Sequence, residues 1–89
     1  MTDNRLRVFC EAAECLNFSK AAAALGISQP AVSNHIAKLE EELGCALFIR
    51  YDKSLILTEK GGQLLKIARS ILDKYAEIDT IREPGSRLP

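Results

Sequence analysis

The chain has 89 residues, of which 47% are hydrophobic and 27% are charged, a composition typical of one small globular domain. Twelve basic and twelve acidic residues give a formal net charge of zero, so the overall charge offers no support for a nucleic-acid partner. The amino-terminal residues lack the apolar core of a signal peptide, and no apolar run approaches the roughly 20 residues of a membrane-spanning helix. We therefore expect a cytoplasmic protein with no membrane partner.

The cysteines and the single histidine do not form a pattern for chemistry. Cys10, Cys15 and Cys45 lack C-x-x-C spacing, and His35 stands apart from them. This argues against a disulfide framework and a zinc site, and it favours thiols that fill helix faces in a reducing intracellular setting. There is also no nucleophile–base pair, glycine-rich phosphate loop or catalytic carboxylate pair. We predict no metal, no cofactor and no enzymatic activity.

Two helices are predicted in the first 26 residues. Residues 4–16 have the apolar period of an amphipathic helix, whose buried face is formed by Leu6, Phe9, Cys10, Ala13 and Leu16. A short alanine-rich helix over residues 20–25 follows, and either Asn17 or Ser19 can cap its start. Gly26 is expected to end it in the left-handed conformation.

The third predicted helix, over residues 28–44, is the element around which the chain is organised. Ser28 can cap it, Pro30 fits its first turn, and Gly44 can end it. Its expected buried stripe is Val32, Ile36, Leu39 and Leu43. Its first turns carry polar residues without an acid, whereas Glu40, Glu41 and Glu42 near its end are interpreted as a solvated face. With the preceding helix and its glycine-containing turn, this predicts a helix-turn-helix.

A hairpin and a long helix complete the predicted fold. Residues 45–51 and 55–57 are compatible with short strands around a turn at residues 52–54, and Thr58 can cap the last helix. That helix has two apolar edges, one expected to pack on the helix-turn-helix and the other to meet a second copy. The residues predicted to dimerise are Leu64, Ala68, Ile71, Leu72, Tyr75 and Ile78. We expect a helix-turn-helix domain with its hairpin over 1–58, a dimerisation helix over 58–83 and a flexible tail over 84–89.

This series of segments resembles the N-terminal DNA-binding domain of LysR-type bacterial transcriptional regulators over about residues 4–82. The carrying residues are Phe18-Ser19, Ala21-Ala22, Leu25, SQPAVS at 28–33, Ile36, Leu39-Glu40, Leu43-Gly44, Leu47-Phe48, Arg50 and LTEKG at 57–61. The resemblance implies a mainly α winged helix-turn-helix, with a three-helix core and a two-stranded wing, followed by a dimerising linker helix. Family members usually continue into an effector-binding domain, so we expect the chain to be a fragment and any small-molecule effector to act through a domain outside it.

The family commonly has an arginine at the position of Asn34 and a glutamine at that of His35. Both departures fall on the predicted reading surface, so the operator sequence of better-known members cannot be transferred.

The predicted function is sequence-specific binding of double-stranded operator DNA by a homodimer, with the helix at about 28–43 in the major groove and the wing at the backbone or minor groove. An amide can pair with adenine N6 and N7, and apolar groups can contact a thymine methyl. The predicted base-reading residues are Gln29, Pro30, Ser33 and Asn34. The predicted backbone and wing residues are Ser19, Lys20, Ser28, His35, Lys38, Arg50 and Lys53.

Two residue roles and one functional alternative stay open at this stage. His35 could be a partly packed flank residue, and Arg50 could be a structural partner for an acid such as Glu40. The alternative function is a winged-helix dimerisation or protein-interaction module without DNA binding, which the zero net charge supports.

Overall fold

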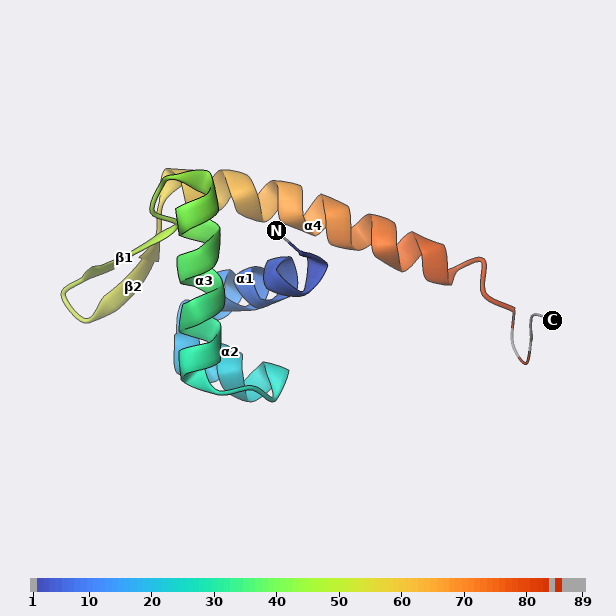
Figure 1. The fold of residues 1–89 in the computed structure, drawn as a ribbon, viewed down its shortest axis with the longest axis horizontal. Helices are drawn as coiled ribbons and strands as arrows, with labels where there is room; N and C mark the ends of the chain where they lie inside the picture. Colours follow the sequence, from blue (N-terminus) through green and yellow to red (C-terminus); the bar gives the residue numbers. More distant parts are fainter. Residues whose placement is uncertain (1, 84, 86–89) are drawn as a thin grey trace.

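The structure is a computed structural model that describes residues 2–83 and 85 of the chain. Its elements, in order, are α1 (Asp3–Cys15), α2 (Phe18–Leu25), α3 (Gln29–Leu43), β1 (Phe48–Tyr51), β2 (Ser54–Leu57) and α4 (Glu59–Asp79) (Figure 1). Three helices, a two-stranded antiparallel wing and a long final helix confirm the predicted winged helix-turn-helix. Of the predicted tail at 84–89, all but residue 85 lies outside the described residues.

Each helix begins at a side-chain cap, and the sequence indicates all of these caps except Thr2, which caps α1. The side chains of Thr2, Asn17, Ser28 and Thr58 each accept a hydrogen bond from the backbone N–H three residues later, at 2.8–3.2 Å. Asn17 rather than Ser19 therefore caps α2, which begins two residues earlier than expected. Gly26 and Gly44, both with φ of 70°, end α2 and α3 in the left-handed conformation.

The ends of α1 and α4 differ from expectation. Leu16 ends α1 with φ of 49° and is 45% exposed, so its predicted place in the core is wrong. The left-handed turn rotates Leu16 off the apolar face of the helix. α4 ends at Asp79, short of residue 83, because the N–H and hydroxyl of Thr80 both donate to the carbonyl of Glu77 and tighten the last turn.

The core lies where α1, α2 and α3 meet the base of the wing. Phe9, Val32, Leu39 and Leu47 are its largest fully buried side chains. The ring of Phe48, the first residue of β1, lies 5.6 Å from that of Phe9 and 5.4 Å, edge to face, from that of Phe18. Through Phe48 the wing is therefore attached to the same core that holds α3.

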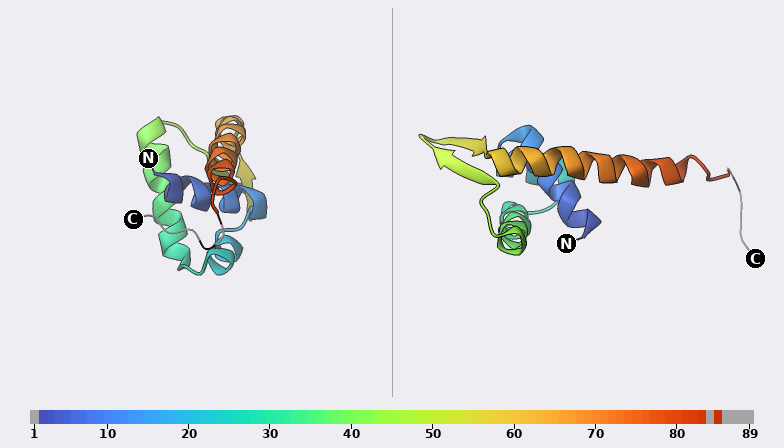
Figure 2. Two further views of the ribbon diagram at one scale, coloured as in Figure 1. Left: turned by 90° about the vertical axis from the view of Figure 1, so that its right-hand side faces the viewer. Right: turned by 90° about the horizontal axis from the view of Figure 1, so that it is seen from above.

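The wing is a tight hairpin that extends away from the helices (Figures 1 and 2). Tyr51 pairs with Ser54, which leaves a two-residue loop of Asp52 and Lys53 with φ of 48° and 72°. Left-handed conformation at both loop residues is the type I′ geometry whose twist matches that of paired strands. The turn thus places Lys53 at the tip, where the sequence predicted it.

α4 packs on α1 with its first half and projects beyond the domain with its second (Figures 1 and 2). Ala68 is fully buried in the contact, and Arg69 donates to Glu14 on α1 at 3.2 Å. Ala68 was predicted to contact a second copy, and this is wrong, because the chain's own core encloses it. Leu43, predicted to be buried at the end of α3, is 43% exposed.

Candidate nucleic-acid interface

The amino-terminal turns of α3 present the polar edge that the sequence predicted. Gln29, Pro30, Asn34 and Lys38 are exposed, while Ser33 is half-buried. Because Ser28 caps the helix through its hydroxyl, which accepts from the Ala31 N–H at 3.2 Å, its side chain is tied to the helix start.

Gln29 and Ser33 are joined to each other across one turn of α3. The Gln29 Nε2 donates to the Ser33 Oγ at 3.1 Å. An amide nitrogen carries two hydrogens, so Gln29 keeps one N–H donor and its carbonyl oxygen, the pair that matches adenine N7 and N6. Ser33 accepts this bond and keeps its own hydroxyl proton for another acceptor. The two side chains are therefore held in place without losing the groups that could contact DNA.

Residues from three separate parts of the chain line one polar hollow beside the start of α3. The hollow has a volume of about 200 Å³ and lies between the first residues of α2, the first residue of α3 and the wing. Four of the predicted site residues line it: Ser19, Gln29, Arg50 and Lys53. Neither cation forms an ion pair with any part of the chain that the structure describes. Two unneutralised cations and a helix start therefore converge on one surface, which suits an anionic ligand.

The other residues predicted to contact DNA, whether at bases or at the backbone, do not line this hollow. Lys20 is exposed in the first turn of α2, where its N–H is already bonded to Asn17 at 2.8 Å. Asn34 and Lys38 are exposed on α3, outside the hollow.

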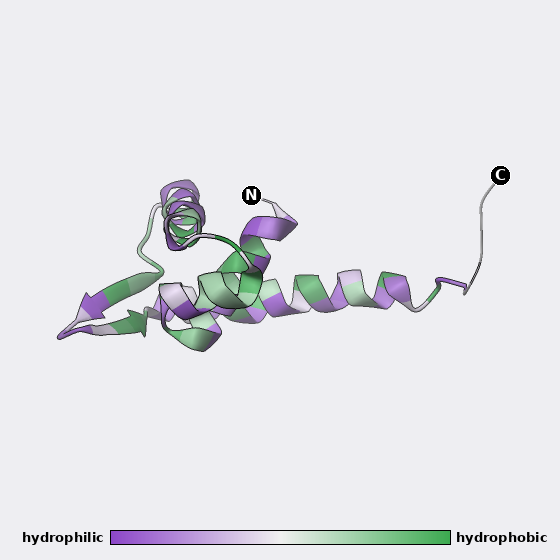
Figure 3. Ribbon diagram, turned by 90° about the horizontal axis from the view of Figure 1, so that it is seen from below, coloured by the Kyte–Doolittle hydropathy of each residue, from purple (hydrophilic) through white to green (hydrophobic). Residues whose placement is uncertain are grey.

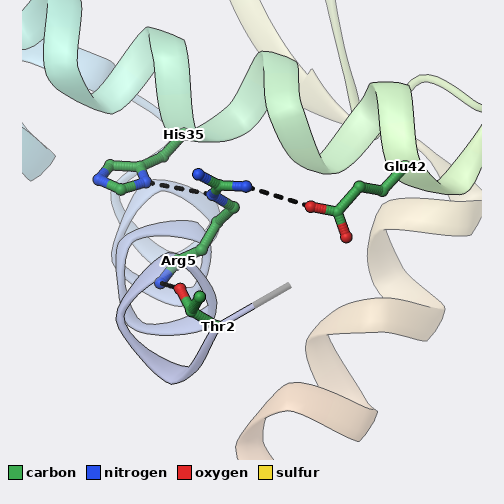
Figure 4. Close-up of polar contacts among 4 residues, drawn as sticks. All are labelled: Thr2, Arg5, His35 and Glu42. Carbon is green, nitrogen blue, oxygen red and sulfur yellow. Dashed lines mark hydrogen bonds and ion pairs between the residues drawn. The ribbon is translucent and has the colours of Figure 1, made fainter.

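His35 is half-buried on the flank of α3, and it contacts the first turns of α1 (Figure 4). Its Nδ1 accepts a hydrogen bond from the Nε of Arg5 at 3.4 Å. The same guanidinium pairs with Glu42 through Nη1 at 3.1 Å. His35 is thus a partly packed residue, which was one of its two predicted roles. Any contact of this side chain with DNA would be made by its other ring nitrogen, Nε2.

Only part of the acidic end of α3 is a solvated face: Glu41 and Glu42 are exposed, as interpreted, whereas Glu40 is half-buried and bonded to the base of the wing, so the interpretation is wrong for Glu40. Glu40 Oε2 accepts from the N–H groups of Leu47 and Phe48 at 2.8 and 3.3 Å. These two donors lie immediately before and at the start of β1, so one carboxylate oxygen satisfies both and ties α3 to the wing. Within residues 2–83 and 85, Arg50 is not an ion-pair partner of Glu40.

Arg5 and the structural role of Glu40 were missed in the sequence. Arg5 adjoins the buried Leu6 on α1, so its stem lies near the apolar face, but its partners follow 30 and 37 residues later. Periodicity identifies which face of a helix is buried, not which distant residue meets its edge. No local signal could have paired these residues.

The cysteines behave as the predicted packing thiols. Cys10 is buried, Cys15 and Cys45 are half-buried, and all three are free. Burial, followed by the negative charge of Glu14, raises the pKa of the Cys10 thiol above its ordinary value. Within the described ranges, no group of histidine, cysteine and acidic side chains could hold a metal ion, and no helix is long and apolar enough to cross a membrane.

The projecting half of α4 carries an exposed apolar stripe. Green turns recur along this part of the helix in Figure 3. Ile71, Tyr75 and Ile78 are 37%, 44% and 59% exposed, and together with Lys74 they line an open hollow of about 220 Å³. The other predicted dimerisation residues, Leu64 and Leu72, are half-buried against the core. The accessible stripe therefore begins farther along α4 than predicted, and it includes Ile67, which is 58% exposed.

Residues 4–62 match the family described as bacterial regulatory helix-turn-helix protein, lysR family. The chain is 49% identical over 73 residues to the HTH-type transcriptional regulator BbuR of Bordetella bronchiseptica, a match that covers 82% of this chain and 22% of BbuR. Among the curated relatives it matches, the chain spans about a quarter of the protein length.

Solved structures of DNA complexes are similar along nearly the whole chain. A crystal structure of BenM_DBD with catB site 1 DNA has a TM-score of 0.86 and 33% identity, and the match covers 91% of each chain. A crystal structure of a CbnR_DBD–DNA complex has a TM-score of 0.83 and 32% identity, covering 90% of this chain and 92% of the other.

Proposed function

Because this chain belongs to the LysR family of bacterial regulatory helix-turn-helix proteins, we propose that it binds double-stranded operator DNA as the dimeric DNA-binding domain of a transcriptional regulator. The observation that carries the proposal is the hollow where Ser19, Gln29, Arg50 and Lys53 converge beside the exposed edge of α3. The similar BenM_DBD and CbnR_DBD structures are complexes with DNA, which supports the same ligand here.

In the proposed complex, α3 lies in the major groove and its first two turns read base edges. The Gln29 and Asn34 amides can each pair with adenine N6 and N7, and the exposed ring of Pro30 can meet a thymine methyl. Gln29 enters this contact already positioned by its bond to Ser33, so less side-chain freedom is lost on binding.

The DNA backbone is contacted on both sides of α3. The start of α2 offers Ser19 and Lys20, and the wing offers Arg50 and Lys53, with Lys53 directed to phosphate or to a narrow minor groove. Ser28 and Lys38 are further backbone candidates on α3. Because the affinity comes from a local group of cations, it should fall steeply with salt although the net charge of the chain is zero.

Dimerisation is proposed through the exposed stripe of α4, formed by Ile67, Ile71, Tyr75 and Ile78. A surface helix with these residues at steps of four and three has an apolar face that its own domain leaves uncovered. A symmetric dimer would present two α3 helices to successive major grooves about 34 Å apart. Ile78→Glu should shift the chain from dimer to monomer in sedimentation velocity, whereas the matched Glu77→Gln, on the charged side, should leave the dimer intact.

The proposal extends to a full-length regulator of the kind that the curated relatives represent. It would respond to a small-molecule effector through a domain outside this chain, act in the bacterial cytoplasm where the operator lies, and carry out no catalysis. The relatives are regulators rather than enzymes, which supports the last point.

Fluorescence anisotropy on duplexes selected from a random pool tests the proposal. A dimer should bind a palindromic duplex with an affinity that falls with salt. Asn34→Ala should relax the preference at one base position, whereas Lys53→Ala should weaken all sequences alike and reduce the salt slope by about one. Absence of any DNA binding by a confirmed dimer would favour the alternative of a protein-interaction module.

A further inference from the structure

Arg5 connects the first turns of α1 to both halves of the recognition helix (Figure 4). Its backbone is fixed by the cap, because the Arg5 N–H donates to Thr2 Oγ1 at 3.1 Å. Its guanidinium then holds Glu42 at 3.1 Å through Nη1 and His35 at 3.4 Å through Nε. One half-buried side chain therefore spans two turns along the flank of α3.

This contact decides which nitrogen of His35 carries the proton. A guanidinium can only donate, so the Nδ1 of His35 must accept, and the proton of the neutral ring must be on Nε2. Figure 4 shows Nε2 on the side of the ring away from Arg5.

The Nε2 group faces water. No buried side-chain nitrogen or oxygen lacks a partner in the part of the chain that the structure describes, and no protein acceptor is bonded to Nε2. The exposed Lys38 lies three positions after His35, which makes the two residues neighbours on the helix surface, so the His35 ring borders the side of α3 proposed to contact DNA.

We propose that Arg5 is a positioning residue that presents His35 Nε2–H to the duplex as a hydrogen-bond donor, an inference that rests on the proposed function. The acceptor class is an oxygen or nitrogen of DNA, either a phosphate oxygen or the O6 or N7 of guanine. Arg5 does not contact DNA in this arrangement. It fixes the ring orientation before binding, while Glu42 fixes Arg5.

The experiment compares Arg5→Ala with Arg7→Ala in the 89-residue chain. Arg7 lies on the same helix and is about half exposed, and among the residues that the structure describes its one ion pair is to Asp3 of α1 at 3.8 Å. Its removal therefore changes the charge equally without touching α3. On a duplex selected by the wild-type chain, Arg5→Ala should bind about fivefold more weakly than Arg7→Ala, the loss of one hydrogen bond.

A double-mutant cycle tests whether Arg5 acts through His35. His35→Ala should lose a similar factor, and Arg5→Ala with His35→Ala should bind no more weakly than His35→Ala alone. Arg5→Lys should resemble Arg5→Ala, because an ammonium cannot hold Nδ1 and Glu42 with a planar fork. The proposal would be overturned by any of three results: losses of DNA affinity that add in the double mutant, wild-type DNA affinity of Arg5→Lys, or equal DNA affinity of Arg5→Ala and Arg7→Ala.

Two measurements separate this inference from the function on which it rests. Ring ¹⁵N spectra of the DNA-free wild-type chain should show His35 protonated on Nε2 only, and a proton on Nδ1 would refute the positioning role without any DNA. Base substitutions in the duplex identify the acceptor: a loss on His35→Ala that is uniform across sequences indicates phosphate, and a loss confined to one guanine indicates a base. If the wild type binds no duplex, the proposed function fails instead.

Discussion

Gly61→Ala and Gly62→Ala should have opposite effects on stability although they are neighbours in the first turns of α4. A Cβ on Gly61 would overlap the Leu47 carbonyl oxygen and lie 2.5 Å from Leu57 Cδ1, whereas a Cβ on Gly62 would have no neighbour within 4 Å. The Leu47 carbonyl cannot move aside freely, because the Thr58 N–H donates to it at 2.9 Å and the Thr58 hydroxyl, which donates to Ala46 at 2.7 Å, also lies 3.2 Å from it.

The magnitude follows from two terms. Overpacking against a fixed backbone group lowers the free energy of unfolding by about 3 kcal/mol, and the higher helix propensity of alanine raises it by about 1 kcal/mol. Gly61→Ala should therefore lower the free energy of unfolding by about 2 kcal/mol. Gly62→Ala keeps only the favourable term. The two variants should therefore differ by about 3 kcal/mol, or by more than roughly 10 °C in Tm.

Thermal unfolding followed by far-UV circular dichroism measures the difference, at one fixed chain concentration because a dimer makes Tm concentration-dependent. Equal Tm values, or a Gly61→Ala variant more stable than Gly62→Ala, would show that α4 does not begin in close contact with the base of the wing. Since this junction sets the direction of α4, such a result would also weaken the proposed dimer geometry.

Two further predictions concern the wing. Glu40→Ala should destabilise the fold by about 1–3 kcal/mol in urea unfolding, because it leaves the Leu47 and Phe48 N–H groups without their acceptor, while Glu40→Gln, whose amide oxygen can still accept, should lose clearly less. An equal loss in both would mean that the negative charge, rather than the acceptor, matters. Lys53→Gly should be more stable than Lys53→Ala by about 1 kcal/mol, because only glycine adopts φ of 72° without strain, yet both should weaken DNA binding similarly. If Lys53→Gly and Lys53→Ala have the same free energy of unfolding, residue 53 does not adopt the left-handed conformation at the tip of the wing.

Much of the fold was predictable from local signals. Ser28 and Thr58 cap their helices, and Gly26 and Gly44 end theirs, because capping depends on a side-chain oxygen or a left-handed residue within a few positions. The wing was placed correctly because Asp52 and Lys53 lie between two apolar strands, although β1 begins later than expected. The exposed edge of α3 followed from the period of its buried residues.

The errors occur where a side chain meets a distant segment. Ala68 has the period of a dimer seam but faces α1, since periodicity cannot tell an internal neighbour from a second copy. Glu40 belongs to an acidic run that suggests solvent, yet it is bonded to backbone donors seven and eight residues away.

The sequence by itself determined the elements, the helix boundaries at Gly26, Ser28, Gly44 and Thr58, the order of helix, turn, helix and wing, and the family, because these depend on neighbouring residues and their spacing. Only the tertiary structure decided which polar groups meet. It gathered Ser19, Gln29, Arg50 and Lys53 around one hollow and set Arg5 against His35, because the approach of separate segments of the chain is fixed by core packing and not by local preference. That packing brings two cations without an ion-pair partner among the described residues, Arg50 and Lys53, beside the start of α3 in a chain of zero net charge.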